Sequence, residues 1–199
     1  MLIIRRKHSF DPVSYVSRVK EYIRLKQEEE RKQSEAVSEM HAAGVQFSFA
    51  DTYDGEEETL LQQIRNAKTP EAAEVLTQKY LDWEKEKAVR SSFSKRVLDW
   101  LERRRMRPSE FYRAAGIEKR TFSKMKNDYL YQPSRDTALR SCFGLRLSWP
   151  DALALLRLAG FTFNPSDSRD LALRYCLEHE LYDIEGVNAL MQLLGEDPF

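Results

Sequence analysis

Cysteine, glycine and proline are scarce in this chain of 199 residues, which has two cysteines, seven glycines and seven prolines. Nothing in a single pair of cysteines suggests a disulfide framework, and neither has a partner at the spacing of a metal-ligand set. An all-β protein needs many tight turns, so the scarcity of glycine and proline favours helices. We therefore expect an all-α protein from a reducing compartment, with Cys142 and Cys176 as buried free thiols.

Long apolar runs and catalytic motifs are missing as well. No apolar stretch approaches the roughly 20 residues that cross a bilayer, and the first residues carry too short an apolar run for a signal peptide. The three histidines, His8, His41 and His179, are isolated, and the acidic run 51–58 lacks the spacing of a calcium loop. No glycine-rich phosphate loop, nucleophile elbow or Cys/His cluster occurs. These absences predict a cytoplasmic protein that is not an enzyme and needs no metal or cofactor.

The net charge is zero, but the charges are segregated along the chain. Residues 1–89 carry 14 basic and 17 acidic side chains, residues 90–160 carry 16 and 7, and residues 161–199 carry 2 and 8. A strongly basic block inside a neutral chain predicts a polyanionic partner. The alternative is that the acidic C-terminal segment folds back and covers the basic block.

Residues 1–89 predict a helical subdomain or an oligomerisation arm without a chemical motif. A long helix is expected over 11–43, a second over 56–66, and a third from Pro70. Residues 44–55 interrupt the helical pattern, and we expect a docked loop because a lone strand would have nothing to pair with.

Residues 90–199 predict a second domain, with a core over 91–160 and acidic helices over 161–199. Its core has five short helices, with Gly116 as a turn between the second and the third. Capping residues and apolar spacing place these helices over 93–107, 108–115, 118–126, 134–143 and 149–159, and two further helices over 168–179 and 184–194.

The segment 106–128, MRPSEFYRAAGIEKRTFSKMKND, resembles the helix-turn-helix of the Cro and phage-repressor family. In the family a glycine and an aliphatic residue make the turn, and Gly116 and Ile117 match them. Two apolar residues hold the recognition helix down, and Phe122 and Met125 match these. The resemblance implies binding of duplex DNA by a basic recognition helix at 118–126, with contacts from Arg107, Lys119, Arg120, Thr121, Ser123, Lys124, Lys126 and Asn127.

The residues support the same interpretation without the family. Glycine tolerates the positive φ that lets two helices meet at a steep angle, while Lys and Arg supply salt-dependent affinity, and Asn and Arg can read base edges. Three positions depart from the family pattern: Tyr112 replaces a small residue between the two helices, Pro108 replaces a glutamine, and Glu118 caps the recognition helix. The arginines at 103, 104, 105 and 107 are expected to flank the site as phosphate contacts.

A second resemblance covers residues 93–188, including Phe122-Ser123-Lys124 and Tyr131-Gln132-Pro133-Ser134. This run is similar to a C-terminal module of bacterial proteins that follows macro domains and other effector domains. It implies that the helix-turn-helix binds protein as readily as DNA. Two functions therefore stay open: a DNA-binding regulator acting as a homodimer, and an adaptor that docks an acidic protein partner. RNA binding by the same helix is a third possibility. Tyr129 and Tyr131 are expected to pack, with base stacking as the alternative.

Overall fold

The computed structural model describes residues 10–42, 55–90 and 92–199, and the regular structure in these ranges is helical throughout. The all-α prediction is confirmed. Most of the loop expected at 44–55 lies outside the described residues. In chain order the elements are η1 (Pro12–Tyr15), α1 (Val16–Ala42), α2 (Gly55–Arg65), α3 (Pro70–Arg90), α4 (Phe93–Arg103), α5 (Pro108–Ala114), α6 (Lys119–Asn127), α7 (Arg135–Gly144), α8 (Trp149–Leu158), α9 (Ser168–Glu178) and α10 (Ile184–Leu194).

The helices begin where the capping residues predict. The hydroxyl oxygen of Ser92 accepts a hydrogen bond from the backbone N–H of Lys95 at 3.2 Å, and Ser134 caps α7 in the same way. Asp11 caps the first element, whose opening turn is the 3-10 helix η1 and not the α-helix expected from residue 11. No helix in the described ranges is both long and apolar enough to cross a bilayer.

Helices α4 to α10 surround one hydrophobic core, with α7 in contact with α5, α8 and α10. Large side chains from several helices are fully buried in this core: Phe111, Met125, Leu139, Phe143 and Leu155. The burial of so much apolar surface around α7 is the main stabilising contribution to this half of the molecule.

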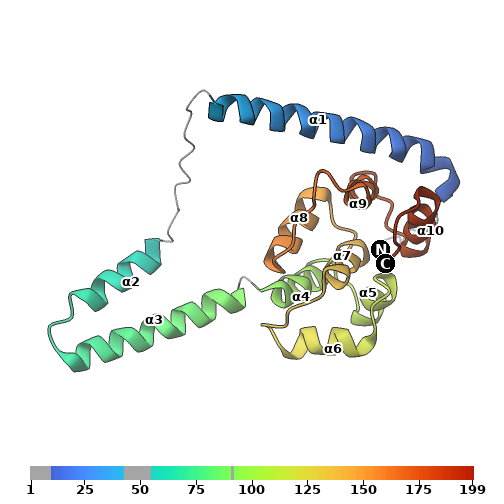
Figure 1. The fold of residues 1–199 in the computed structure, drawn as a ribbon. Helices are drawn as coiled ribbons and strands as arrows, with labels where there is room; N and C mark the ends of the chain where they lie inside the picture. Colours follow the sequence, from blue (N-terminus) through green and yellow to red (C-terminus); the bar gives the residue numbers. More distant parts are fainter. Residues whose placement is uncertain (1–9, 43–54, 91) are drawn as a thin grey trace.

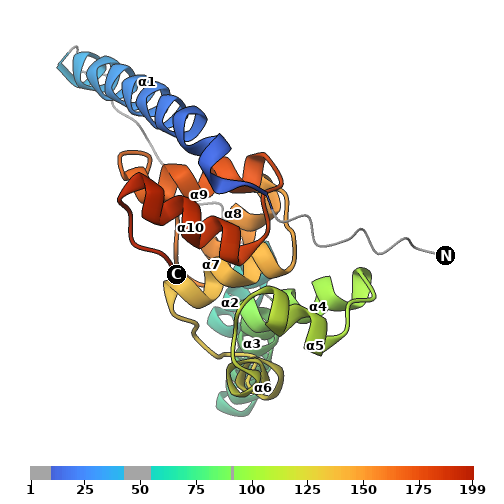
Figure 2. The same cartoon turned by 90° about the vertical axis from the view of Figure 1, so that its right-hand side faces the viewer.

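The first half of α1 packs against this core from outside, across α9 and α10 (Figures 1 and 2). Val19 is fully buried there, and the hydroxyl of Tyr22 donates a hydrogen bond to the Glu178 carboxylate at 2.9 Å. The second half of α1 extends beyond the core, and exposed ion pairs such as Arg31–Glu35 at 2.8 Å line its surface. The sequence from Lys26 to Glu35 carries no apolar side chain, which accounts for a helical segment that leaves the core.

Helices α2 and α3 form an antiparallel hairpin that projects from the core beside α4 (Figure 1). Leu60 is the one buried side chain that its described residues provide. One face of α3, including Leu76, Tyr80 and Trp83, is half-buried. Polar contacts add to this face, because Lys87 pairs with Glu57 at 3.0 Å and Trp83 Nε1 donates to Glu56 at 3.0 Å. The hairpin is held far more loosely than the core.

Candidate nucleic-acid interface

The second and third helices of the predicted motif, α5 and α6, are joined by the predicted glycine turn. Gly116 has a φ of +60°, a conformation that costs little only for glycine. Its carbonyl oxygen accepts a hydrogen bond from Arg140 Nη1 at 3.0 Å, which ties the turn to α7. Ile117 is buried directly after it. The local helix-turn-helix geometry therefore forms as the spacing predicts.

The inner face of α6 is anchored in the core. Met125 is fully buried, Phe122 is 6% exposed, and the Phe122 ring lies 5.7 Å from the ring of Phe111. Tyr112, the large residue at a position where the repressor family has a small one, lies 6.3 Å from Phe122, ring to ring. Its ring is thus part of the packing between α5 and α6. Both anchors predicted from the sequence are confirmed.

The outer face of α6 points into solvent. Of the side chains predicted to contact DNA from this helix, Thr121 is half-buried. The other six are exposed, namely Lys119, Arg120, Ser123, Lys124, Lys126 and Asn127. None of the four cations pairs with a carboxylate of the described residues. A row of cations with no internal partner keeps its full charge available for an external anion.

The arginines that flank α6 differ in their availability. Arg107 is paired with Glu110 at 2.6 Å, and its hydrogen bonds hold the pKa of that carboxyl below its usual value. Arg104 donates to the carbonyl oxygens of Leu145 and Arg146 and lies over the Trp100 ring at 4.8 Å. Partial burial lowers the pKa of Arg104. Its predicted role as a phosphate contact therefore competes with a structural one, whereas Arg105 is exposed.

The acidic helices α9 and α10 lie away from the basic face. They pack against α7, α8, α1 and η1, while α6 packs against α4 and α5. Both views place α6 on the lower side of the core helices and α1 with α9 on the upper side (Figures 1 and 2). Several acidic side chains are engaged locally: Glu178 pairs with Arg174 at 2.7 Å, and buried Asp170 with Arg135 at 2.6 Å. In the described part of the chain, the C-terminal acids do not cover α6.

A short tip at the end of α6 carries two exposed apolar side chains. Tyr129 is 42% exposed and Leu130 is 56% exposed, whereas Tyr131 is half-buried against the core. Packing was expected for both tyrosines, and the structure shows it for Tyr131 alone. The sequence signal for the tip is an apolar pair, Tyr129 and Leu130, inside a polar interhelical loop.

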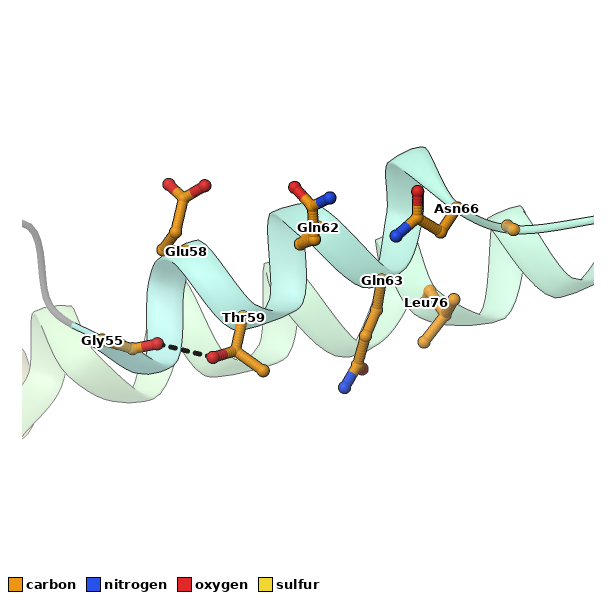
Figure 3. Close-up of a pocket in the computed structure, with 8 residues that line it drawn as sticks. Gly55, Glu58, Thr59, Gln62, Gln63, Asn66 and Leu76 are labelled. Carbon is orange, nitrogen blue, oxygen red and sulfur yellow. Dashed lines mark hydrogen bonds between the residues drawn. The ribbon is translucent and has the colours of Figure 1, made fainter.

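Two hollows elsewhere were compared with the α6 face. An open groove of about 910 Å³ runs along α2, lined by uncharged polar and small side chains, by Leu76 of α3, and by Glu58 as the single acid (Figure 3). A smaller hollow of about 340 Å³ lies beside α9, where Arg135 and Asp170 satisfy each other's charge. Neither hollow contains a residue predicted as a site. Among the described residues there is also no cluster of three His, Cys, Asp or Glu that suits a metal ion.

Comparisons of the chain with known protein families, with curated proteins and with solved structures gave no match. The resemblances to the repressor family and to the bacterial C-terminal module therefore stay hypotheses, and the functional argument depends on the residues themselves.

Proposed function

We propose that the chain is a regulatory protein that binds duplex DNA through the outer face of α6. The observation that carries the proposal is the exposure of its basic side chains on a helix pinned by Phe122 and Met125, with no described acid covering it. A helix of nine residues is about 13 Å long, which is comparable with the width of the major groove. The proposed contacts are Lys119, Arg120, Thr121, Ser123, Lys124, Lys126 and Asn127, with Arg107 at the edge.

The side chains divide into two proposed roles. Lys119, Lys124 and Lys126 neutralise phosphates. The logarithm of the affinity therefore falls with the logarithm of the salt concentration, with a slope proportional to the number of phosphates contacted. Asn127 and Arg120 are the side chains suited to base edges, because Asn pairs with adenine and Arg with guanine in the major groove. Glu118, at the N-cap, would repel phosphate and limits the approach at that end of α6.

The functional unit we propose is a homodimer. A single helix-turn-helix buries little surface on DNA, and two half-sites raise affinity and specificity together. The apolar face of α9 and α10 is already covered by η1 and α1. The α2–α3 hairpin is less covered, since Val75 is 70% exposed and Leu81 is 49% exposed. This favours the hairpin as the element that joins the protomers.

The test is a salt titration of binding to random-sequence duplex DNA, followed by fluorescence anisotropy. We expect measurable affinity at low salt and a steep loss as salt rises. The triple variant Lys119→Ala, Arg120→Ala, Lys124→Ala should lose this affinity. A matched control carries alanine at three exposed cations of α1, namely Lys20, Arg31 and Lys32. It should fold normally, because exposed ion pairs contribute little to stability. Its affinity for DNA should stay within about twofold of that of the native chain.

The outcomes separate the two functions. Affinity that is absent at low salt overturns the DNA proposal and favours the adaptor that docks an acidic protein. Affinity that the control variant loses to the same extent shows a diffuse charge effect and not an α6 site. Tighter binding to structured RNA than to duplex DNA transfers the proposal to RNA.

A further inference from the structure

Exposed apolar side chains cluster at the tip that follows α6. The helical core, residues 92–199, exposes three large hydrophobic side chains, namely Tyr129, Leu130 and Leu193. Two of the three are neighbours in sequence, and both lie directly after the helix that carries the exposed cations. Contiguous exposed apolar side chains rimmed by polar residues mark interaction sites more often than single exposed ones do.

The tip is held in a fixed shape. The Asp128 carboxylate accepts a hydrogen bond from the backbone N–H of Leu130 at 2.9 Å, and the Asp128 carbonyl accepts one from Tyr131 at 3.2 Å. On the far side the chain is secured by half-buried Tyr131 and by buried Pro133. The backbone is thereby ordered before any partner binds, which reduces the entropy cost of binding.

We infer that Tyr129 and Leu130 form an apolar wedge that contacts an unstacked base step of the nucleic acid bound by α6. This inference depends on the proposed DNA binding. The last turn of α6 places Lys124 and Lys126 next to the tip, and cations interleaved with exposed rings favour stacked bases over an apolar protein surface.

The position of the tip suits a wedge. It follows the C-terminal end of a helix about as long as the major groove is wide, so a helix that crosses the groove delivers the tip to its edge. Beyond that edge lies the adjacent minor groove, from which leucine is among the side chains that enter base steps, unstack them partially and kink a duplex. A tyrosine ring stacks on any base face. The ligand class is therefore a duplex that opens readily at one step, in preference to a rigid regular duplex.

The experiment compares two duplexes of one length, one regular and one with a two-base mismatch that carries 2-aminopurine. The native chain should bind the mismatched duplex about tenfold more tightly, because the cost of opening the step is already met. Its binding should also change the 2-aminopurine fluorescence, because the wedge alters the stacking of that base. The double variant Tyr129→Ser, Leu130→Ser should lose both the preference and the fluorescence change. Leu193→Ser, which alters a leucine 47% exposed on α10, should keep both.

Each result decides one claim. Equal binding of both duplexes by the native chain overturns the wedge and leaves the α6 proposal standing. A preference that persists in the double variant also overturns the wedge. Binding to neither duplex at low salt overturns the α6 proposal, and the wedge with it. Circular dichroism of the double variant confirms its fold, so a lost preference cannot come from unfolding.

Discussion

At the scale of single residues, the two cysteines are packed as small apolar side chains. Both are fully buried, and burial raises the pKa of Cys176 to about 12 and that of Cys142 further. The nucleophile in thiol reactions is the thiolate, so neither residue should react in the folded protein at pH 8. We predict no labelling by a disulfide reagent in buffer and labelling of both thiols in guanidinium chloride. Rapid labelling of one thiol in buffer would contradict the burial.

The same burial makes stability depend on pH. The pKa of each thiol is higher in the folded protein than in the unfolded chain, where it is about 8.5. Its contribution to stability is therefore complete below about pH 8.5 and is lost as the pH rises toward the folded-state pKa. Burial also raises the pKa of Tyr175 and Tyr182, which adds to the effect at higher pH. We predict that the free energy of unfolding in urea falls as the pH rises from 8 to 10. A constant or rising value would contradict the assigned direction.

At the scale of helices, Gly144 of α7 lies directly against Ala115, the C-cap residue of α5. A Cβ added at Gly144 would lie 2.5 Å from the Ala115 Cβ and 2.9 Å from its backbone nitrogen. Backbone cannot move aside cheaply, so Gly144→Ala must push the two helices apart. We predict a loss of about 2–3 kcal/mol in the free energy of unfolding, the upper range for overpacking.

Gly160→Ala is the matched control for this substitution. Gly160 has a φ of +78° with nothing within 4 Å of an added Cβ, so the substitution costs only backbone strain. We expect about 1–2 kcal/mol there. A loss at Gly144 no larger than the loss at Gly160 would show that the close approach relaxes freely.

Helix positions were predictable because their determinants are local. Ser92, Ser134 and Ser148 cap the helices that follow them, and apolar spacing gives the anchors Phe122 and Met125. The contact between Gly144 and Ala115 joins separate helices, and no spacing rule reveals it. The candidate site divides in the same way: the exposed face of α6 follows from helical periodicity, whereas the engagement of Arg104 by the carbonyls after α7 depends on tertiary packing.

At the scale of the whole molecule, Phe10 and the first half of α1 are part of the core packing. Val19 is fully buried between α1 and the helices it covers, and a Cβ on Gly186 of α10 would meet the Phe10 ring at 2.8 Å. The sequence indicated a division near residue 89, because the charge and the motifs change there. Nothing local in α1 identifies α9 and α10 as its neighbours, so this docking was not predictable.

The docking can be tested with two valines. Val19→Ala leaves a cavity under α1, and we predict a loss of about 1–2 kcal/mol in the free energy of unfolding of the whole helical core. Val75→Ala removes the same methyl groups from a side chain that is 70% exposed on α3. It should change the free energy of unfolding by less than about 0.5 kcal/mol. If Val19→Ala left the core transition unchanged, α1 would unfold separately from α9 and α10.

The hairpin gives the remaining prediction, which concerns assembly. A two-helix unit with Leu60 as its buried side chain has little apolar burial to hold it, so α2 and α3 should exchange amide hydrogens much faster than α7 in dilute protein. If the hairpins of two protomers pack together, their protection must rise with concentration, because association stabilises by mass action. We predict a dimer by light scattering at tens of micromolar, and slower exchange in α2 and α3 at that concentration.

The double variant Val75→Glu, Leu81→Glu should return the dimer to monomer and weaken DNA binding, since the second half-site contact is lost, while the core keeps its melting temperature. Val13→Glu, Leu25→Glu alters side chains of similar exposure, 67% and 46%, on η1 and α1, and should leave the dimer intact. A native chain that stays monomeric at every concentration would refute the dimer. The α6 contacts are tested separately, by the salt dependence of DNA binding. Dissociation by both variants alike would show a general effect of the added negative charge and would contradict a specific hairpin interface, because such an interface makes the two pairs of substitutions differ.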